Sequence, residues 1–198
     1  MRVKIYLALV GVLLAASVFA QEQKPPKLTP EQQAMMDAWM KFATPGESHK
    51  ALNNMVGTWD AKTTMWEAPG AEPHVSMATS ETHWLLGNRY VQETVNGSFM
   101  GMPFQGIGIT GYDNAKKQYF NTWFDNFGTG VMTSVGTMAD AKTLALKTSM
   151  TDPMSGKDIP GEMRITIADA DHHTMESWAP APDGKMFKNM QVEYIRHK

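Results

Sequence analysis

The feature that most constrains this chain is a series of short strand-type segments that begins at Val56 and continues to Arg196. Turn-forming residues separate the segments, and no segment in this part repeats its apolar residues at helical spacing. We expect about ten strands, near residues 56–67, 74–86, 89–96, 103–112, 117–126, 130–138, 142–149, 160–168, 172–179 and 186–196. A meander of consecutive hairpins leaves exposed edges unless it closes, so we predict one antiparallel, lipocalin-like β-barrel over residues 56–198.

The most informative segment is a predicted hairpin from Gly101 to Asn126. On its first strand Gly106 and Gly108 share one face, where another group can approach the backbone closely. One face of the second strand carries four residues that we expect to point into the barrel: Tyr119, Asn121, Trp123 and Asp125. We expect Phe120 and Phe124, on the opposite face, to lie beneath an N-terminal helix.

One or two short helices are predicted ahead of the barrel, over residues 29–55. Thr29-Pro30 followed by Gln32 is a typical helix start, and Thr44-Pro45-Gly46 repeats that signal. Five large apolar residues then recur at helical spacing: Met35, Met36, Trp39, Met40 and Phe42. An apolar stripe of this kind is normally covered, which is why we expect it to pack on the barrel.

The first 20 residues have the pattern of a secretory signal peptide. A basic start is followed by the apolar run Ile5–Ala16 and by small residues at Val18 and Ala20. We predict cleavage after Ala20, a flexible lead-in over residues 21–28, and a periplasmic or secreted protein. The apolar run is shorter than the roughly 20 residues that span a bilayer, and no later stretch reaches that length, so we expect no integral membrane segment after cleavage.

Composition excludes several classes of function. The chain has no cysteine, which excludes thiol catalysis and thiolate metal sites. Its formal net charge is −2, and cleavage of the signal peptide would make it slightly more acidic, which argues against nucleic acid as a partner.

Neither a metal nor a cofactor is predicted. His172 and His173 are adjacent, so on a strand they point to opposite faces, and a hairpin turn explains them better than a metal site. A barrel histidine such as His83 or His173 could hold haem iron, but nothing in the sequence selects either. The chain has 17 methionines, which suit a flexible apolar core better than a copper site because they are scattered.

The start and the end of the strand region carry a recognisable pair of motifs. Gly57-Thr58-Trp59 resembles the Gly-x-Trp opening of lipocalins and fatty-acid-binding proteins, in which the tryptophan closes one end of a barrel, often under a basic residue from the last strand. Arg196 follows Tyr194 at the position that this resemblance implies for the basic residue. Tyr194 with Arg196 is also a pair that fatty-acid carriers use to hold a carboxylate, but we favour Arg196 as the cap of Trp59.

A wider set of residues is similar to the bacterial family called domain of unknown function 1579, over about residues 45–196. The matching segments are Pro45-Gly46 with His49, Leu52 with Gly57-Thr58-Trp59, Trp84 with Gly87-Asn88-Arg89, Gly101-Met102-Pro103-Phe104 with Gly106, Gly111-Tyr112-Asp113, Tyr119 with Trp123-Phe124-Asp125, Gly136, and Tyr194-Ile195-Arg196. The resemblance implies a lipocalin-like barrel. It implies no established activity, so no catalytic residue is assigned.

Six residues are candidates for binding a ligand inside the barrel: Trp84, Glu93, Trp123, Asp125, Trp178 and Tyr194. Trp123 and Asp125 would form an aromatic wall with an acceptor, or else Trp123 fills the core and Asp125 ties down the next turn. Glu93 shares a face with Arg89, and the ordinary surface preference of charged residues favours a solvent face for both. A buried Glu93 would instead need a partner such as Arg164 or Arg196.

Three functions are compatible with these observations. The first is an exported protein that binds a small apolar or amphipathic molecule in a barrel cavity. The second is an enzyme that uses interior carboxylates such as Glu93 or Asp125 as acid or base. The third is a filled barrel that binds an unidentified protein partner. The sequence favours the first function and leaves catalysis undecided.

Overall fold

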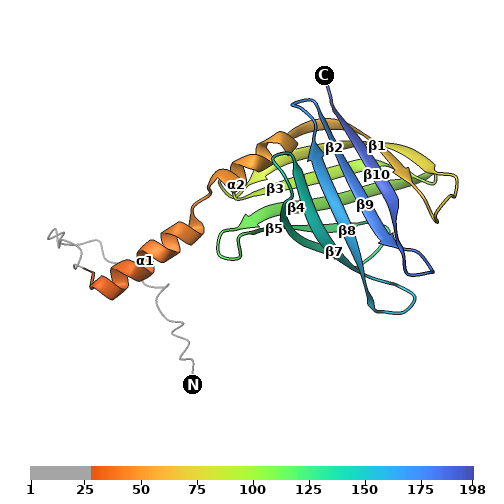
Figure 1. Cartoon of the computed structure of the whole chain (residues 1–198). Helices are drawn as coiled ribbons and strands as arrows, with labels where there is room; N and C mark the ends of the chain where they lie inside the picture. The colour runs from red at the N-terminus through yellow and green to blue at the C-terminus, as the bar shows by residue number, and fades with distance from the viewer. Residues whose placement is uncertain (1–27) are drawn as a thin grey trace, which may run out of the picture. The chain divides into compact units, whose positions relative to one another are not determined.

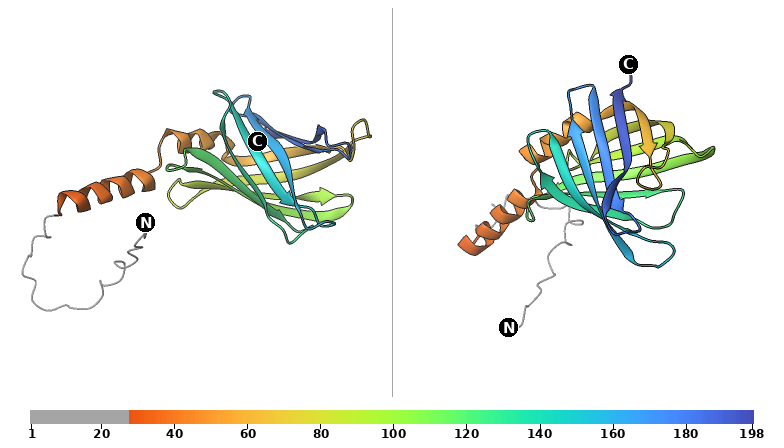
Figure 2. Two further views of the ribbon diagram at one scale, coloured as in Figure 1. Left: turned by 60° about the horizontal axis from the view of Figure 1, so that its bottom comes forward. Right: turned by 45° about the vertical axis from the view of Figure 1, so that its right-hand side comes forward.

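The computed structural model describes residues 28–198 and contains a closed barrel of ten antiparallel strands (Figure 1; Figure 2). The strands are β1 (Gly57–Met65), β2 (His74–Leu85), β3 (Tyr90–Phe99), β4 (Met102–Asp113), β5 (Gln118–Asp125), β6 (Met132–Met138), β7 (Thr143–Thr151), β8 (Asp158–Ile167), β9 (His172–Pro180) and β10 (Met186–Arg196). Each strand pairs with its neighbour in the chain, and β1 pairs with β10 to close the ring. The predicted antiparallel barrel is therefore confirmed.

Contacts divide the chain into two units, one of which ends at Asp37, while the other, Ala38–Lys198, contains the barrel. Helix α1 (Pro30–Ala43) crosses this boundary. The predicted signal peptide, its cleavage after Ala20 and most of the lead-in lie outside the described residues. Within residues 28–198, none of the helices is both long enough and apolar enough to span a membrane.

Two short helical segments lie over one end of the barrel, which we call the closed end (Figure 1). They are α2 (Glu47–Lys50) and the 3-10 helix η1 (Ala51–Met55). Leu52 of η1 is buried in the main apolar cluster, together with Val91 and Tyr119 of the barrel. The Tyr119 hydroxyl also donates a hydrogen bond of 2.9 Å to the backbone oxygen of Ser48. The helical segments therefore seal this end with both apolar and polar contacts.

The opposite end, which we call the open end, is less completely paired. Residues His74–Met77 of β2 pair with β1 but not with β3, whose pairing with β2 stops at Gly97. Residues Asp158–Gly161 of β8 likewise pair with β7 but not with β9. A depression of about 410 Å³ lies where β2 and β3 separate, lined by residues 74–77 and 98–101. The wall is thus continuous at the closed end and divided at the open end.

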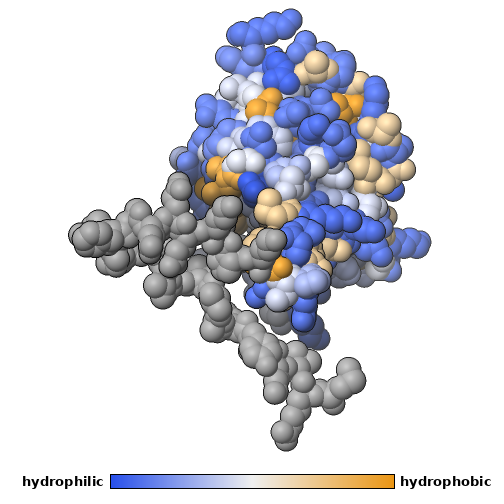
Figure 3. Space-filling view, turned by 90° about the vertical axis from the view of Figure 1, so that its left-hand side faces the viewer, coloured by the Kyte–Doolittle hydropathy of each residue, from blue (hydrophilic) through white to orange (hydrophobic). Residues whose placement is uncertain are grey.

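The outward face of β5 is not covered in the way the sequence suggested. Phe124 is 37% exposed, and Phe120 packs against Tyr90 on the neighbouring outer surface, with ring centroids 6.0 Å apart. Trp39 and Met40, which belong to the same unit as the barrel, are also exposed. The expected packing of the helix stripe on Phe120 and Phe124 is therefore wrong for the part of α1 that belongs to the barrel unit. In Figure 3, which shows one side of the molecule, hydrophilic residues dominate and apolar residues stand in small groups.

One turn is shifted from its predicted position. Asn96-Gly97 was expected to close a hairpin, because this pair is typical of type I′ turns. Strand β3 instead continues to Phe99, and the hairpin closes at Met100 and Gly101, which have φ angles of 51° and 77°. Gly97 lies inside the strand. A larger residue would not fit there, because a Cβ would come within 2.6 Å of the Cβ of Ala78. Close approach of β2, rather than a turn, is what requires this glycine.

Candidate ligand-binding site

Trp123 forms part of the inner wall of the barrel and lies flat against strand β4. A Cβ at Gly106 would be 2.2 Å from the Trp123 ring, and a Cβ at Gly108 would be 3.2 Å from it. The two glycines therefore leave space for the indole, since any larger side chain at Gly106 would displace it. Phe104, on the same inward face of β4, stacks with Trp123 at a centroid distance of 6.4 Å. Trp123 is only partly buried, so the indole keeps some exposed surface.

Asp125 is held by two contacts of its own hairpin. Its Oδ2 accepts a hydrogen bond of 2.9 Å from Nε1 of Trp123. Its Oδ1 accepts a bond of 3.0 Å from the backbone N–H of Phe127. The carboxylate thus fixes both the indole and the turn that follows β5, as the structural interpretation of this residue predicts. Asp125 therefore orients the aromatic wall.

Glu93 lies on the inward face of β3, between Val91 and Val95, rather than on a solvent face. Its Oε1 accepts a hydrogen bond of 2.7 Å from the hydroxyl of Ser80 on β2. Burial raises the pKa of the Glu93 carboxyl above its usual value, because the charged form loses hydration there. Arg89, which was expected to share its face with Glu93, instead precedes the strand and donates to the backbone oxygen of Ala43.

Tyr194 is buried between Glu93 and a histidine. Burial and the neighbouring Glu93 carboxylate raise the pKa of the Tyr194 phenol well above its ordinary value. The other side of Tyr194 stacks on His173, with ring centroids 4.2 Å apart. His173 is 5% exposed, and its Nδ1 has no hydrogen-bond partner in the part of the chain that the structure describes. Tyr194 therefore links the interior carboxylate to the packed closed end.

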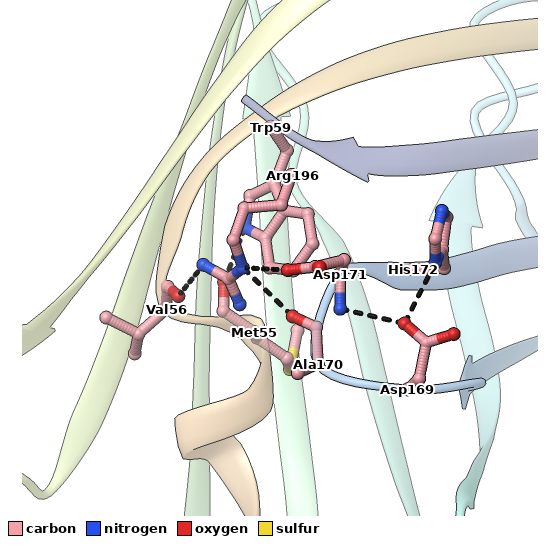
Figure 4. Close-up of polar contacts among 8 residues, drawn as sticks. All are labelled: Met55, Val56, Trp59, Asp169, Ala170, Asp171, His172 and Arg196. Carbon is pink, nitrogen blue, oxygen red and sulfur yellow. Dashed lines mark hydrogen bonds and ion pairs between the residues drawn. The ribbon is translucent and has the colours of Figure 1, made fainter. Parts of the chain in front are cut away.

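The closed end is completed by the pair Trp59 and Arg196 (Figure 4). The Arg196 guanidinium lies 4.0 Å from the Trp59 ring centroid, and the two residues face each other in the β1–β10 pairing. Gly57, with φ of 137°, leaves room for this guanidinium, because a Cβ there would be 2.2 Å from Nη1. This is the arrangement that the Gly-x-Trp and Tyr-x-Arg motifs predict.

Two nitrogens of the Arg196 guanidinium, Nε and Nη1, contact backbone oxygens and a carboxylate at the closed end. Its Nη1 donates to the Val56 oxygen at 3.1 Å, and its Nε donates to the Ala170 oxygen at 2.9 Å (Figure 4). Nε is also 3.3 Å from a carboxylate oxygen of Asp171. Arg196 is therefore committed to closing the barrel, and it does not bind a carboxylate in the interior as the corresponding residue of a fatty-acid carrier does.

Two other predicted ligand-binding residues lie away from the open interior. Trp84 is on the inward face at the closed end, where its Nε1 donates to Asn53 Oδ1 at 3.0 Å and its ring packs against the main apolar cluster. Trp178 is on the outer face, because the adjacent Ser177 is paired with the inward Met163. The Arg164 guanidinium lies 4.9 Å from its ring. Glu93, Trp123 and Asp125 are the predicted residues that lie on the inward face beyond the closed end and are only partly buried.

Sequence reasoning placed Asn121 on the inner wall but missed the polar belt to which it belongs. Thr110, Asn121, Ser134 and Thr148 are direct partners across β4, β5, β6 and β7. Asn121 donates from Nδ2 to the Thr110 hydroxyl at 2.9 Å, while the buried Ser134 hydroxyl has no hydrogen-bond partner within residues 28–198. The signal was present, since each of these hydroxyl or amide side chains lies two positions from an apolar residue or glycine on the same face of its strand. Together with Glu93, this belt makes the inner wall partly polar.

Within residues 28–198, no three histidine, aspartate or glutamate side chains are grouped so that they could hold a metal ion. His172 is exposed and contacts Asp169 at 2.8 Å, whereas His173 is buried beside Trp59. The two histidines therefore point to opposite faces, as predicted for adjacent residues of a strand.

Comparison with known proteins shows the fold and the family. Rv2717c from M. tuberculosis aligns with a TM-score of 0.56 and 14% identity, covering 78% of this chain and 100% of the other. The S-type phycobiliprotein lyase CPES from Guillardia theta aligns with a TM-score of 0.53 and 10% identity, covering 81% of this chain and 97% of the other. No curated protein matches the sequence. The model of one family, "Protein of unknown function (DUF1579)", matches residues 44–196, so the chain belongs to the DUF1579 family.

Proposed function

We propose that this protein binds a small apolar or amphipathic molecule inside its barrel, through the open end. The observation that carries this proposal is the difference between the two ends. The closed end is sealed by Trp59, Arg196 and η1, whereas Trp123 retains exposed surface on the inner wall. An inner wall that is mostly apolar, with a few fixed polar groups, is typical of small-molecule sites. The two solved structures support the fold and do not specify a ligand.

Replacement of Trp123 tests this proposal. We expect the protein to bind the neutral dye N-phenyl-1-naphthylamine, with increased dye fluorescence, and Trp123→Ala to weaken that binding by about fivefold, the effect of losing one aromatic contact of about 1 kcal/mol. The matched control is Trp178→Ala, which removes a tryptophan from the outer face. Circular dichroism would check that both variants fold. Failure of the folded native protein to bind the dye, or an equal effect of the two substitutions, would contradict an interior site.

An enzyme that uses the same interior is the second candidate. The specific observation in its favour is Glu93, because a buried carboxyl with a raised pKa suits a general acid or base. A substrate would have to enter the same interior, so the dye experiment tests the step that both functions share.

We also propose that the protein is exported and that the mature chain begins at Gln21. The support is the signal-peptide pattern of residues 1–20. We expect the intact mass of the protein, purified from its own host, to correspond to residues 21–198. A mass that includes residues 1–20 would show that the predicted cleavage is wrong.

A further inference from the structure

The inward-facing carboxyl of Glu93 has no cationic partner among residues 28–198. Its contacts are a hydrogen bond of 2.7 Å from Ser80 and the neighbouring Tyr194 phenol. The two arginines that could have paired with it are used elsewhere. Arg164 lies over Trp178 on the outer face, and Arg196 lies over Trp59 at the closed end. When Glu93 is ionised, its charge is therefore not compensated by any ion pair among the described residues.

The rest of the inner wall also lacks positive charge. In the strands of residues 28–198, Arg196 is the single lysine or arginine on the inward register, and it belongs to the closed end. Lys62 and Lys147 are exposed on the outside, and Lys188 contacts the outward-facing Glu176 at 2.9 Å. The inward-facing His173 has a pKa lowered to about 4, so it is neutral near pH 7. The interior thus contains carboxylates without a free cation.

The lack of positive charge on the inner wall disfavours anionic ligands and favours cationic ones. An anionic head group would be repelled by Glu93 and would find no free arginine or lysine inside. A protonated amine would supply the missing positive charge and donate hydrogen bonds to the carboxylate oxygens. It would also offset the cost of keeping a carboxylate out of water, because a buried charge is tolerated when it is paired.

The geometry also provides a place for the apolar part of such a ligand. Glu93 on β3 and Trp123 on β5 are both direct partners of Gly108 on β4, so they lie on either side of the same residue. Gly108 has no side chain to separate them, and the Trp123 ring extends over Gly106 toward the open end. An amine at Glu93 would therefore have its hydrocarbon chain next to an aromatic wall. Asp125 is the less suitable anchor, since its carboxylate already holds the Trp123 indole and the backbone of Phe127.

We propose that the barrel binds an amphipathic amine, with its protonated nitrogen at Glu93 and its apolar chain along Trp123 toward the open end. This inference rests on the proposed small-molecule binding and specifies the class of ligand. It distinguishes the protein from carriers of fatty acids, whose ligand has the opposite charge.

Three ten-carbon molecules that differ in their head group test the inference: decylamine, decanol and decanoate. Each would be used below its micelle concentration to displace N-phenyl-1-naphthylamine from the native protein at pH 7. We expect decylamine to compete about tenfold better than decanol, the effect of one charge-assisted hydrogen bond, and decanoate to compete least. We expect Glu93→Gln to remove the advantage of decylamine and to leave decanol unchanged. The control is Glu81→Gln on β2, because Glu81 is exposed on the outer face.

The outcomes separate this inference from the proposed function. If the dye binds and the three molecules displace it equally, or if decanoate competes best, the amine inference is wrong and the binding function stands. If the folded native protein does not bind the dye, both fail. The order of the three molecules on the native protein decides the matter even when Glu93→Gln does not fold. Retention of the decylamine advantage in a folded Glu93→Gln protein would also overturn the inference.

Discussion

Replacing Trp59 with alanine is expected to lower the free energy of unfolding by about 3–5 kcal/mol, as for other buried aromatic residues. Trp59 is 1% exposed, and it contacts three parts of the closed end. Its Nε1 donates to the Met55 oxygen at 2.9 Å, its ring supports Arg196, and its edge meets His173 at a centroid distance of 4.4 Å. The substitution leaves a cavity and also removes the hydrogen bond that joins η1 to β1.

Urea unfolding followed by circular dichroism would measure this effect. Trp39→Ala is the matched control, because Trp39 is 64% exposed and its removal should change the free energy of unfolding by no more than about 0.5 kcal/mol. A loss below about 1 kcal/mol for Trp59→Ala would show that the closed end does not depend on this tryptophan.

Acidification is expected to destabilise the protein through His173. Its pKa is lowered to about 4 in the folded protein, mainly by burial and then by the charge of Arg196, whereas the ordinary value is 6.5. The folded state therefore prefers the neutral imidazole, and stability falls as pH decreases from about 6.5 to below 4. The total contribution of this one group is about 3 kcal/mol, since each pKa unit corresponds to about 1.4 kcal/mol.

The variant His173→Phe would isolate this contribution. Phenylalanine keeps a flat ring beside Tyr194 and removes the unpaired Nδ1, so its unfolding free energy should depend less on pH between 6.5 and 4. Other groups also titrate in this range. His49, whose pKa is lowered by burial, adds to the acid loss, whereas Glu93, whose pKa is raised, opposes it. The measured quantity is therefore the difference between the native and variant pH profiles. His172→Phe, at an exposed position, is the control, and parallel native and His173→Phe profiles would refute the assignment.

Much of the barrel could be predicted from sequence because its information is local. Alternating side chains and turn residues determine each hairpin within a dozen positions, and the chain pairs every strand with its neighbour. The closure of the ring followed from the need to pair the two edge strands. The misplaced turn at Asn96-Gly97 shows the limit of local patterns, because the glycine is needed for contact with Ala78 on another strand.

The interior was harder to predict, since alternation separates two faces of a strand without saying which one points inward. Glu93 was expected to face solvent because it is charged, although Val91 and Val95 on its own face indicated the opposite. Trp178 was expected inside because it is aromatic, although Glu176 shares its face. In both cases the residue type and the neighbours on the same face of the strand indicated opposite orientations. The neighbours predicted the orientation correctly. The space beside Gly106 could not be assigned to Trp123 without the pairing of β4 and β5.

The incomplete pairing at the open end means that the barrel is not equally stiff around its circumference. Between His74 and Met77 the backbone of β2 is attached to the sheet on one side only, and the same holds for β8 between Asp158 and Gly161. Separating β2 from β3, or β8 from β9, over these residues breaks no hydrogen bonds between the paired strands. Separating β1 from β10 beside Trp59 breaks several. Opening the wall therefore costs fewer backbone hydrogen bonds at the open end than at the closed end.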